Sequence, residues 1–253
     1  MRKLFIAVLI SVALINGCSR KTGAGNSGSS SKLPARKGEV LFLGNASKHH
    51  DATKYSPWLA ESLSQLGINT TYTIKPADLN DSNLSKYDGL IIYANHNNIS
   101  PAQEAALKNF VEGGKGFIPL HAASACFGNS EWYIKTVGGQ YKSERTGVFT
   151  PKIINTSHPV MQGVQEFTTW DERYVHQKIN PDMTVLMERV EGETREPWTW
   201  VRTQGKGRVF YTASGHNDST WTNPAFMRLV NNGVLWAIGD QVKDQIRRFN
   251  RSK

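Results

Sequence analysis

The sequence predicts an α/β domain with a mostly parallel sheet flanked by helices and an antiparallel extension in its second half. Three observations lead to this fold. In the first half, short apolar runs alternate with helical patterns, as in a sheet whose parallel strands are connected by helices. Those runs are continuous rather than alternating, which is typical of strands buried on both faces. In the second half, strand-like runs follow one another with little helix between them.

Four strands and two helices are expected in the first half. Each strand ends at a glycine or a polar loop, and the helices carry start and stop signals, such as Ser100 with Pro101 and the terminating Gly67. The expected strands are residues 39–44, 69–74, 88–94 and the run that ends at His121, and the expected helices are residues 57–66 and 101–113.

The second half is expected to hold four more strands and one strong helix. Turn residues separate the strands, and Phe226, Leu229 and Val230 give the helix a core face. No internal repeat or second linker is present, so a single domain is expected over residues 39–239. The expected strands are residues 147–155, 184–190, 198–202 and 207–213, and the expected helix is 224–238.

Residues 1–17 predict a bacterial lipoprotein signal peptide. A basic start precedes an apolar stretch at residues 4–15 that is too short to span a bilayer stably, and small residues lead to Cys18. This pattern predicts cleavage before Cys18, lipidation of its thiol, and export to a membrane-anchored position facing the periplasm. The alternative is an ordinary secretory signal with a chance cysteine.

The net charge of +9 lies mainly outside the predicted domain. Residues 1–37 hold seven Lys or Arg and no acid, and a second basic cluster lies in the carboxyl-terminal tail, residues 240–253. The excess charge therefore belongs to a flexible Gly/Ser/Lys tether, residues 18–38, and to that tail, so no nucleic-acid partner is indicated. The only other cysteine, Cys126, has no disulfide partner once Cys18 is lipidated and is expected to be a small buried hydrophobe.

Six of the seven histidines follow strand-like runs. In an open α/β sheet, ligands bind beyond the carboxyl ends of the strands, so a polar residue that ends an apolar strand is well placed for chemistry. His121, which ends the fourth strand, is therefore the first candidate for a functional residue. The other histidines in such positions are His49, His50, His96, His176 and His216.

These histidines, with the acidic pair Asp171 and Glu172, predict one of two kinds of site. Imidazole and carboxylate groups are ligands for a zinc-like divalent metal, although no local His-x-x-x-His spacing is present. The same groups could supply a general base and hydrogen-bonding partners for a sugar. Tryptophan rings in neighbouring segments could stack on sugar faces or pack within the sheet. They are Trp170, Trp198, Trp200 and Trp221.

Two enzyme classes find no support in the sequence. It contains neither a Gly-x-Ser-x-Gly elbow nor a Walker or dinucleotide glycine fingerprint, so serine esterase and nucleotide-dependent chemistry are not expected. Ala122 and Ala123 follow His121, where a strand-to-helix elbow would carry its nucleophile. Covalent catalysis is therefore not expected at this strand end.

Several motifs occur in a fixed order over nearly all of residues 39–239. They are the apolar run 40–44 with the histidine pair after it, Tyr-Asp-Gly-Leu at 87–90, residues 110–122, Val-Gly-Gly at 137–139, Ser-His-Pro-Val-Met-Gln-Gly at 157–163, Trp-Asp-Glu-Arg-Tyr-Val-His at 170–176, and residues 200–216. In this combination the chain resembles the trehalose-utilisation (ThuA-like) family.

The resemblance implies a class I glutamine-amidotransferase-like fold of the flavodoxin-like type, without glutaminase activity. It also implies a role in sugar metabolism, around trehalose and related glycosides that sugar oxidoreductases convert to keto sugars. The functional residues that it carries over are His49 or His50, His121, Asp171, Glu172 and His216, with His176 next and His158 as a structural residue. The family often has a histidine after the glycine pair at 138–139, where this chain offers Glu144 instead.

The sequence therefore predicts a lipid-anchored protein that acts on a glycoside or keto-glycoside as a hydrolase or lyase. His121, Glu172, Asp171 and His216 are its expected catalytic residues. The alternatives are a non-catalytic carbohydrate-binding lipoprotein and a metal-dependent hydrolase. The expected substrate-binding residues are His49, His50, His176, Trp170, Trp221 and Glu144.

Overall fold

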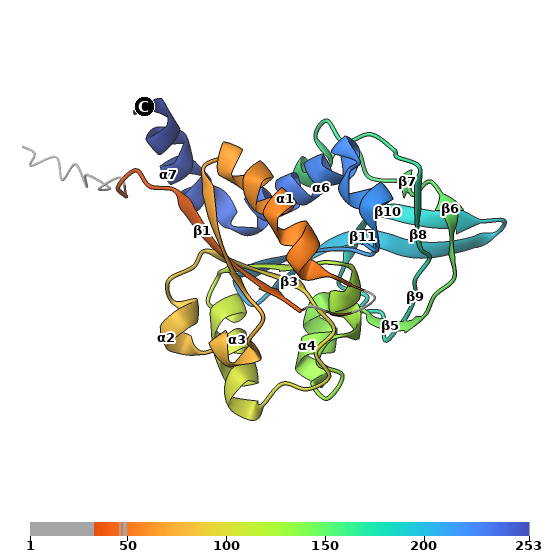
Figure 1. The fold of residues 1–253 in the computed structure, drawn as a ribbon, viewed down its shortest axis with the longest axis horizontal. Helices are drawn as coiled ribbons and strands as arrows, with labels where there is room; N and C mark the ends of the chain where they lie inside the picture. The colour runs from red at the N-terminus through yellow and green to blue at the C-terminus, as the bar shows by residue number, and fades with distance from the viewer. Residues whose placement is uncertain (1–32, 46, 48–49, 253) are drawn as a thin grey trace, which may run out of the picture. The chain divides into compact units, whose positions relative to one another are not determined.

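An eight-stranded sheet in the order β2-β1-β3-β4-β12-β11-β10-β7 lies at the centre of the described residues (Figure 1). The structure is a computed structural model and describes residues 33–45, 47 and 50–252. The parallel strands are β2 (Ile68–Thr73), β1 (Gly38–Gly44), β3 (Gly89–Tyr93), β4 (Gly116–Pro119) and β12 (Gly207–Thr212), and the antiparallel strands are β11 (Thr194–Gln204), β10 (Thr184–Glu191) and β7 (Lys152–Ile153).

Helices cover both faces of this sheet. In Figure 1, α1 and α6 lie on one face and α2, α3 and α4 on the other, while α7 packs near the start of β1. The helices are α1 (Ala52–Gln65), α2 (Asp81–Leu84), α3 (Pro101–Glu112), α4 (Glu131–Val137), α5 (Asp218–Trp221), α6 (Pro224–Ala237) and α7 (Gly239–Arg251), with 3-10 turns η1 (Pro76–Asp78), η2 (His121–Ala125) and η3 (Pro159–Met161).

The predicted fold is confirmed. The parallel strands follow the flavodoxin-like order 2-1-3-4-5, and the antiparallel strands extend the sheet beyond β12. The parallel strands are buried because helices cover both faces, and every residue of β3 is buried. Two small antiparallel pairs stand beside the main sheet, β5 (Gln140–Ser143) with β9 (Val175–Gln177), and β6 (Thr146–Phe149) with β8 (Thr169–Glu172).

The main differences from the expected elements lie in α1 and in the strand expected over 147–155. Helix α1 begins at Ala52 rather than Pro57, because the Asp51 side chain accepts the Thr53 backbone N–H and caps an earlier first turn. The strand expected over 147–155 is divided at Pro151, which has no N–H to donate to a ladder. Strand β6 before the proline pairs with β8, whereas β7 after it joins the main sheet.

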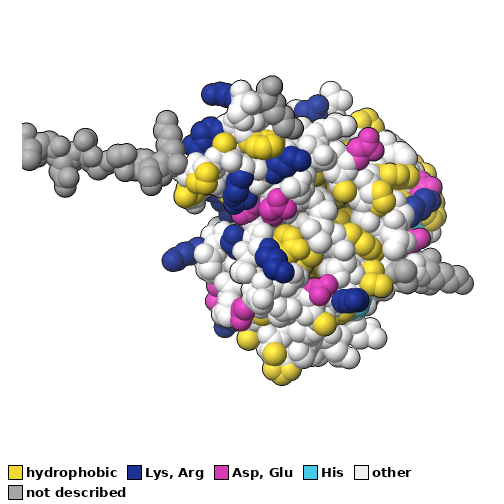
Figure 2. Space-filling view, turned by 60° about the vertical axis from the view of Figure 1, so that its left-hand side comes forward, with side chains coloured by type: hydrophobic (Ala, Val, Ile, Leu, Met, Phe, Trp, Pro, Cys, Tyr) yellow, Lys and Arg dark blue, Asp and Glu magenta, His cyan; other side chains and the backbone are white. Residues whose placement is uncertain are grey.

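The basic tail is a helix in the structure. Helix α7 buries Ile246, and its Gln245 side chain donates a hydrogen bond to the Pro34 carbonyl oxygen. Acidic side chains on the same helix pair with its basic ones, as Asp240 does with Lys243. Figure 2 shows Lys and Arg side chains interspersed with Asp, Glu and hydrophobic side chains on the visible face. Within the described part of the chain, no helix combines the length and hydropathy needed to span a membrane.

Asp88, directly before β3, connects the segment before β1 to the sheet. Its carboxylate accepts hydrogen bonds from the Arg36 guanidinium at 2.6 and 2.7 Å and from the Glu39 backbone N–H at 3.0 Å. Burial raises the pKa of Asp88, but the hydrogen bonds from Arg36 and Glu39 outweigh burial and lower the pKa below its usual value. The folded state therefore stabilises the ionised carboxylate.

Substituting Asp88→Asn should lower the free energy of unfolding at neutral pH by about 1–3 kcal/mol, because an amide cannot accept all of these hydrogen bonds. Since the folded-state pKa is depressed, this stabilisation is present above the unfolded-state pKa of about 3.9 and is lost as the pH falls through the folded-state pKa. Thermal unfolding curves of the two proteins should therefore converge below about pH 4.

The control is Glu166→Gln, which removes a carboxylate from an exposed pair with Lys152. This change should alter stability by no more than about 1 kcal/mol at any pH. Equal losses of unfolding free energy in the two variants would contradict a specific stabilising role for the hydrogen bonds to Asp88.

Candidate functional site

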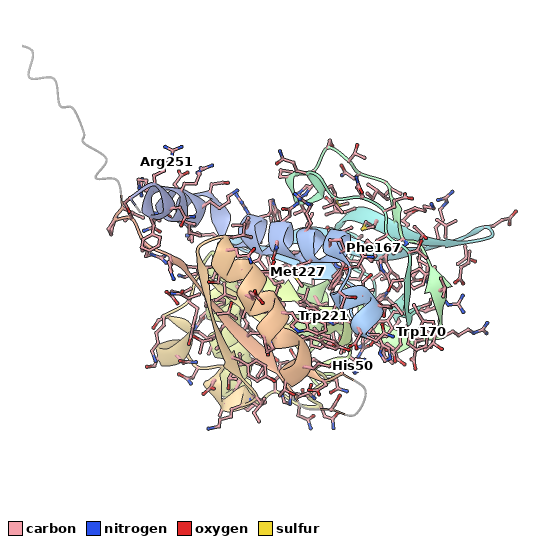
Figure 3. The ribbon with its side chains drawn as sticks, turned by 45° about the horizontal axis from the view of Figure 1, so that its top comes forward. His50, Phe167, Trp170, Trp221, Met227 and Arg251 are labelled. Carbon is pink, nitrogen blue, oxygen red and sulfur yellow. The ribbon has the colours of Figure 1, made fainter. Side chains whose placement is uncertain are left out.

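Three histidines lie at one edge of the sheet because the strands before them are parallel. His50 follows β1, His121 follows β4 and His216 follows β12. Glu172, the last residue of β8, comes to the same edge from outside the main sheet. In Figure 3, His50 marks this edge, and Arg251 of α7 lies far from it. We call His50, His121, His216 and Glu172 the His–Glu cluster.

The side chains of the His–Glu cluster converge on one carboxylate. Glu172 Oε2 lies 3.3 Å from His50 Nε2 and 3.3 Å from His121 Nε2, and Glu172 Oε1 lies 3.1 Å from His216 Nδ1. The ring centroid of His50 lies 4.9 Å from that of His121 and 5.5 Å from that of His216. One donor atom from each residue lies within 4.8 Å of all the others.

His121 is held in a strained conformation at the turn from β4 into η2. Its φ is +45°, in the left-handed region that L-residues other than glycine seldom occupy, and its side chain is fully buried. Its Nδ1 lies 2.6 Å from the Ala213 carbonyl oxygen, so this nitrogen carries the hydrogen and Nε2 faces Glu172. The strained elbow residue is therefore His121 itself, which corrects the expectation that the following alanines take that place.

Asp171 fixes the loop that carries His216. The Asp171 carboxylate is fully buried and accepts the backbone N–H groups of Gly215 at 2.9 Å and His216 at 3.1 Å, together with the Thr220 hydroxyl at 2.6 Å. The Gly215 carbonyl oxygen accepts further hydrogen bonds from the Tyr93 hydroxyl and the Trp221 indole N–H. Asp171, expected to be catalytic, thus lies behind the cluster and positions His216.

Glu172, His50 and His216 have shifted pKa values. Burial raises the pKa of Glu172, but the three imidazoles close to its carboxylate outweigh burial and keep the pKa well below its usual range. Burial lowers the pKa of His50. Burial also lowers the pKa of His216, but the carboxylates of Glu172, Asp171 and Glu144 raise it by more. Near neutral pH, Glu172 is therefore ionised, and His216 takes up a proton more readily than His50.

Tyr174 belongs to the site, although the sequence did not single it out. Its hydroxyl oxygen lies 3.4 Å from His50 Nε2, and its ring stacks on that of His121 at a centroid distance of 4.4 Å. The available signal was its place two residues after Glu172 in the Trp-Asp-Glu-Arg-Tyr-Val-His motif. A tight turn, in which the Tyr174 N–H donates to the Glu172 carbonyl oxygen at 3.0 Å, brings it to the cluster.

His176 lies behind His121. Its Nδ1 is 3.2 Å from Glu196 Oε1, and its Nε2 is 3.0 Å from the hydroxyl oxygen of Tyr211. The Tyr211 hydroxyl in turn donates to the His121 carbonyl oxygen. Both ring nitrogens of His176 are thus engaged within the protein, and burial lowers its pKa. The structure gives His176 a supporting position rather than a place facing solvent.

The tryptophans expected near the site differ in exposure. Trp170 is 38% exposed, and its ring centroid lies 5.8 Å from that of His216. Trp221 is 2% exposed and stacks on Tyr55, so its ring faces the core beneath the site (Figure 3). Trp198 and Trp200 are fully buried. Of these rings, Trp170 alone is accessible to a ligand.

The remaining candidates lie elsewhere or outside the described residues. His96 Nε2 is 3.2 Å from the Gly44 carbonyl oxygen, and His158 Nδ1 accepts the Val160 N–H. Cys126 is buried, and burial raises the pKa of its thiol. Glu144 is exposed just after β5. His49 and Cys18 lie outside the described residues.

Comparisons with known proteins agree on the fold. A family model described as "ThuA: Trehalose utilisation" matches residues 39–237. A ThuA-like protein of Bacteroides uniformis is 19% identical with a TM-score of 0.63, covering 80% of this chain and 91% of its own. A ThuA-like protein of Parabacteroides merdae is 17% identical with a TM-score of 0.65, covering 80% and 90%.

A more distant likeness extends to part of a larger enzyme. The β-galactosidase of Bacillus circulans is 13% identical with a TM-score of 0.55, and the match covers 81% of this chain and 31% of that one. No curated protein matches the chain. At these identities, the structural likenesses establish the fold alone.

The strain at His121 predicts an unusual order of stability. His121→Gly should be more stable than His121→Ala by about 1 kcal/mol in denaturant unfolding, because glycine adopts a positive φ without steric cost. The control is the same pair of changes at Lys108, exposed in the middle of α3, where the glycine variant should be the less stable one by about 0.5–1 kcal/mol. The same order at both positions would argue against backbone strain at His121.

Proposed function

The chain belongs to the ThuA (trehalose utilisation) family, and from this premise we propose that it acts in sugar catabolism as a hydrolase or lyase on a glycoside or keto-glycoside of the trehalose type. The observation that carries the proposal is the position of Glu172. Its ionised carboxylate lies within 3.3 Å of three imidazoles, at the sheet edge where α/β proteins bind ligands.

In the proposed reaction, Glu172 is the general base. A keto group acidifies the neighbouring C–H bond, and the carboxylate removes that proton while the electron pair moves to the carbonyl oxygen. The electron pair then returns and breaks the glycosidic C–O bond, and an imidazolium supplies the proton that the leaving alcohol needs. His216, the histidine with the raised pKa, is suited to this second role. Addition of water to the resulting double bond completes a net hydrolysis.

The described residues directly after β4 include no accessible serine or cysteine nucleophile, which favours acid/base over covalent catalysis at this strand end. Ala122 and Ala123 follow His121, and the thiol of Cys126 is buried with a raised pKa. Negative charge that develops on a substrate oxygen would instead be stabilised by hydrogen-bond donors. His50 and the Tyr174 hydroxyl, which lie 3.4 Å apart, are the proposed donors.

Substrate contacts are proposed on the exposed side of the cluster. The partly exposed ring of Trp170 beside His216 offers a stacking surface for a sugar. His49 and Glu144 remain proposed substrate-binding residues. His49 directly precedes His50 in the chain, and the negative charge of Glu144 helps to raise the pKa of His216. A sugar oxidoreductase of the same pathway is the proposed source of the keto-glycoside.

A second candidate function is carbohydrate binding without turnover. The exposed Trp170 favours it, because a stacking surface serves a binding protein as well as an enzyme. The two functions differ in the effect that loss of Glu172 should have on glycoside affinity and turnover. A binding protein would keep its glycoside affinity after loss of Glu172 and lose it after loss of Trp170.

Glu172→Gln should reduce turnover of keto-disaccharides by about 10²- to 10⁴-fold, the usual contribution of a general base, in a screen of oxidised and unoxidised disaccharides. The matched control is Glu131→Gln, which removes an exposed carboxylate paired with Lys178 and should leave turnover unchanged. Unchanged turnover in folded Glu172→Gln would end the assignment of Glu172 as base. Calorimetry showing binding but no turnover by the parent would favour the binding function.

We also propose that residues 1–17 are a signal peptide and that the mature protein is anchored by lipid on Cys18, facing the periplasm. In bacterial cells, Cys18→Ala should abolish incorporation of labelled fatty acid and leave an unprocessed precursor. The control is Cys126→Ala, which retains the proposed lipidation site. Processing and labelling of Cys18→Ala like the parent would contradict lipid anchoring at this residue.

A further inference from the structure

We propose that the His–Glu cluster binds a divalent transition-metal ion of the zinc type, with His50 Nε2, His121 Nε2, His216 Nδ1 and a Glu172 carboxylate oxygen as ligands. The inference deepens the proposed function, because it names a cofactor for the same site. Only the role of the ion in sugar turnover rests on the proposed function; the binding of the ion does not. The metal itself is inferred from donor spacing, donor direction, ligand type and the groups behind the ligands.

The spacing of the donor atoms suits a metal ion. Zinc bonds to imidazole nitrogen and carboxylate oxygen are about 2.0–2.2 Å long, so neighbouring ligand atoms in a tetrahedral site are roughly 3.4 Å apart. The carboxylate oxygens of Glu172 lie 3.3, 3.3 and 3.1 Å from the three histidine nitrogens. The four donor atoms all lie within 4.8 Å of one another, so small side-chain rotations would place them around a common centre.

The direction of the donors argues for a cation between them. His121 Nδ1 donates its hydrogen to the Ala213 carbonyl oxygen, which leaves the lone pair of Nε2 directed at Glu172. His121 is fully buried, and its Nε2 has no hydrogen-bond partner among the described residues. A bare lone pair facing a carboxylate at 3.3 Å is repulsive, and a shared cation removes the repulsion.

His216 presents a second donor of the same kind. Its Nδ1 is also buried and lacks a hydrogen bond of good geometry among the described residues, although it lies 3.1 Å from the carboxylate. Protonating every imidazole instead would place like charges on rings whose centroids are only 4.9–5.9 Å apart. Such an arrangement is costly in a buried site.

The ligand set selects the class of ion. Three imidazole nitrogens and one carboxylate oxygen suit zinc, iron, cobalt, nickel or manganese, whereas calcium and magnesium prefer oxygen ligands throughout. The groups behind the ligands are those that metal sites use to orient histidines. The Ala213 carbonyl fixes the tautomer of His121, and the Asp171 carboxylate holds the backbone of His216.

The site also leaves room for a substrate oxygen. His121 forms the fully buried end of the cluster, whereas the side chains of His50, Glu172 and His216 are 10%, 11% and 16% exposed. A coordination position directed at solvent is therefore expected opposite His121. There the ion would bind and polarise the carbonyl or a hydroxyl oxygen of the sugar. Because Glu172 and His216 would then be ligands, the ion would take the place of the acid and base roles that these two side chains have in the metal-free reaction.

The test uses the full chain purified in detergent without chelator. Elemental analysis should find close to one equivalent of a transition metal, and Co²⁺ added to chelator-treated protein should bind with one-to-one stoichiometry and give visible absorption bands. Glu172→Gln and His216→Ala should each weaken Zn²⁺ binding at least about 100-fold in calorimetry. His216 is the most exposed of the three histidine ligands, so this variant should keep the fold even if the other does not.

The matched control is His158→Asn, whose amide oxygen can still accept the Val160 N–H while one imidazole is removed far from the cluster. It should bind Zn²⁺ like the parent. The inference is overturned if the parent binds none of Zn²⁺, Co²⁺, Mn²⁺, Fe²⁺ or Ni²⁺, or if the cluster variants bind them as tightly as the parent does.

Failure of the metal and failure of the proposed function give different results. Undiminished sugar turnover by metal-free parent protein would overturn the metal as cofactor and leave acid/base catalysis in place. Stoichiometric metal that depends on the cluster residues, without turnover of any glycoside or keto-glycoside, would support the metal site and overturn the enzyme.

Discussion

The site depends on the buried Asp171 carboxylate. This group is fully inaccessible to solvent, and such a charge is tolerated only because the backbone N–H groups of Gly215 and His216, the Thr220 hydroxyl and the Glu172 N–H all donate to it. The same hydrogen bonds join β8 to the loop after β12. Because neighbouring residues on a strand face opposite sides, binding Asp171 to the loop turns Glu172 toward the imidazoles. One acidic pair thus supplies both a structural anchor and the centre of the cluster.

The opposite side of the site is built on the strained turn at His121. A left-handed conformation in a buried residue persists only where its surroundings over-determine it. Here Ala213 accepts the His121 ring N–H, Tyr174 stacks on the ring and the Tyr211 hydroxyl donates to the main-chain carbonyl, with His176 behind it. The imidazole is therefore held with one free nitrogen facing Glu172. This degree of positioning is typical of functional residues rather than of a core histidine.

The chain combines a widespread fold with a particular set of side chains at one sheet edge. An α/β sheet of this order brings the residues after β1, β4 and β12 to one edge whatever their identity, so the fold permits many reactions there. In this member of the ThuA family, histidines occupy those positions. The chemistry proposed for it comes from these side chains and from Glu172, and the fold supplies only their common location.

The sequence alone determined the sheet, because continuous apolar runs such as β1 and β3 identify buried strands from local residues. It also placed His50, His121 and His216 among six candidate histidines, since each follows a strand-like run and the carboxyl ends of parallel strands meet at one edge. Only the tertiary structure distinguished Asp171 from Glu172, placed Trp221 in the core and brought Tyr174 to His50. Adjacent carboxylates look alike in a sequence, and what each contacts is decided by segments roughly 45 to 120 residues away. Those long-range contacts are set by packing, which local patterns do not encode.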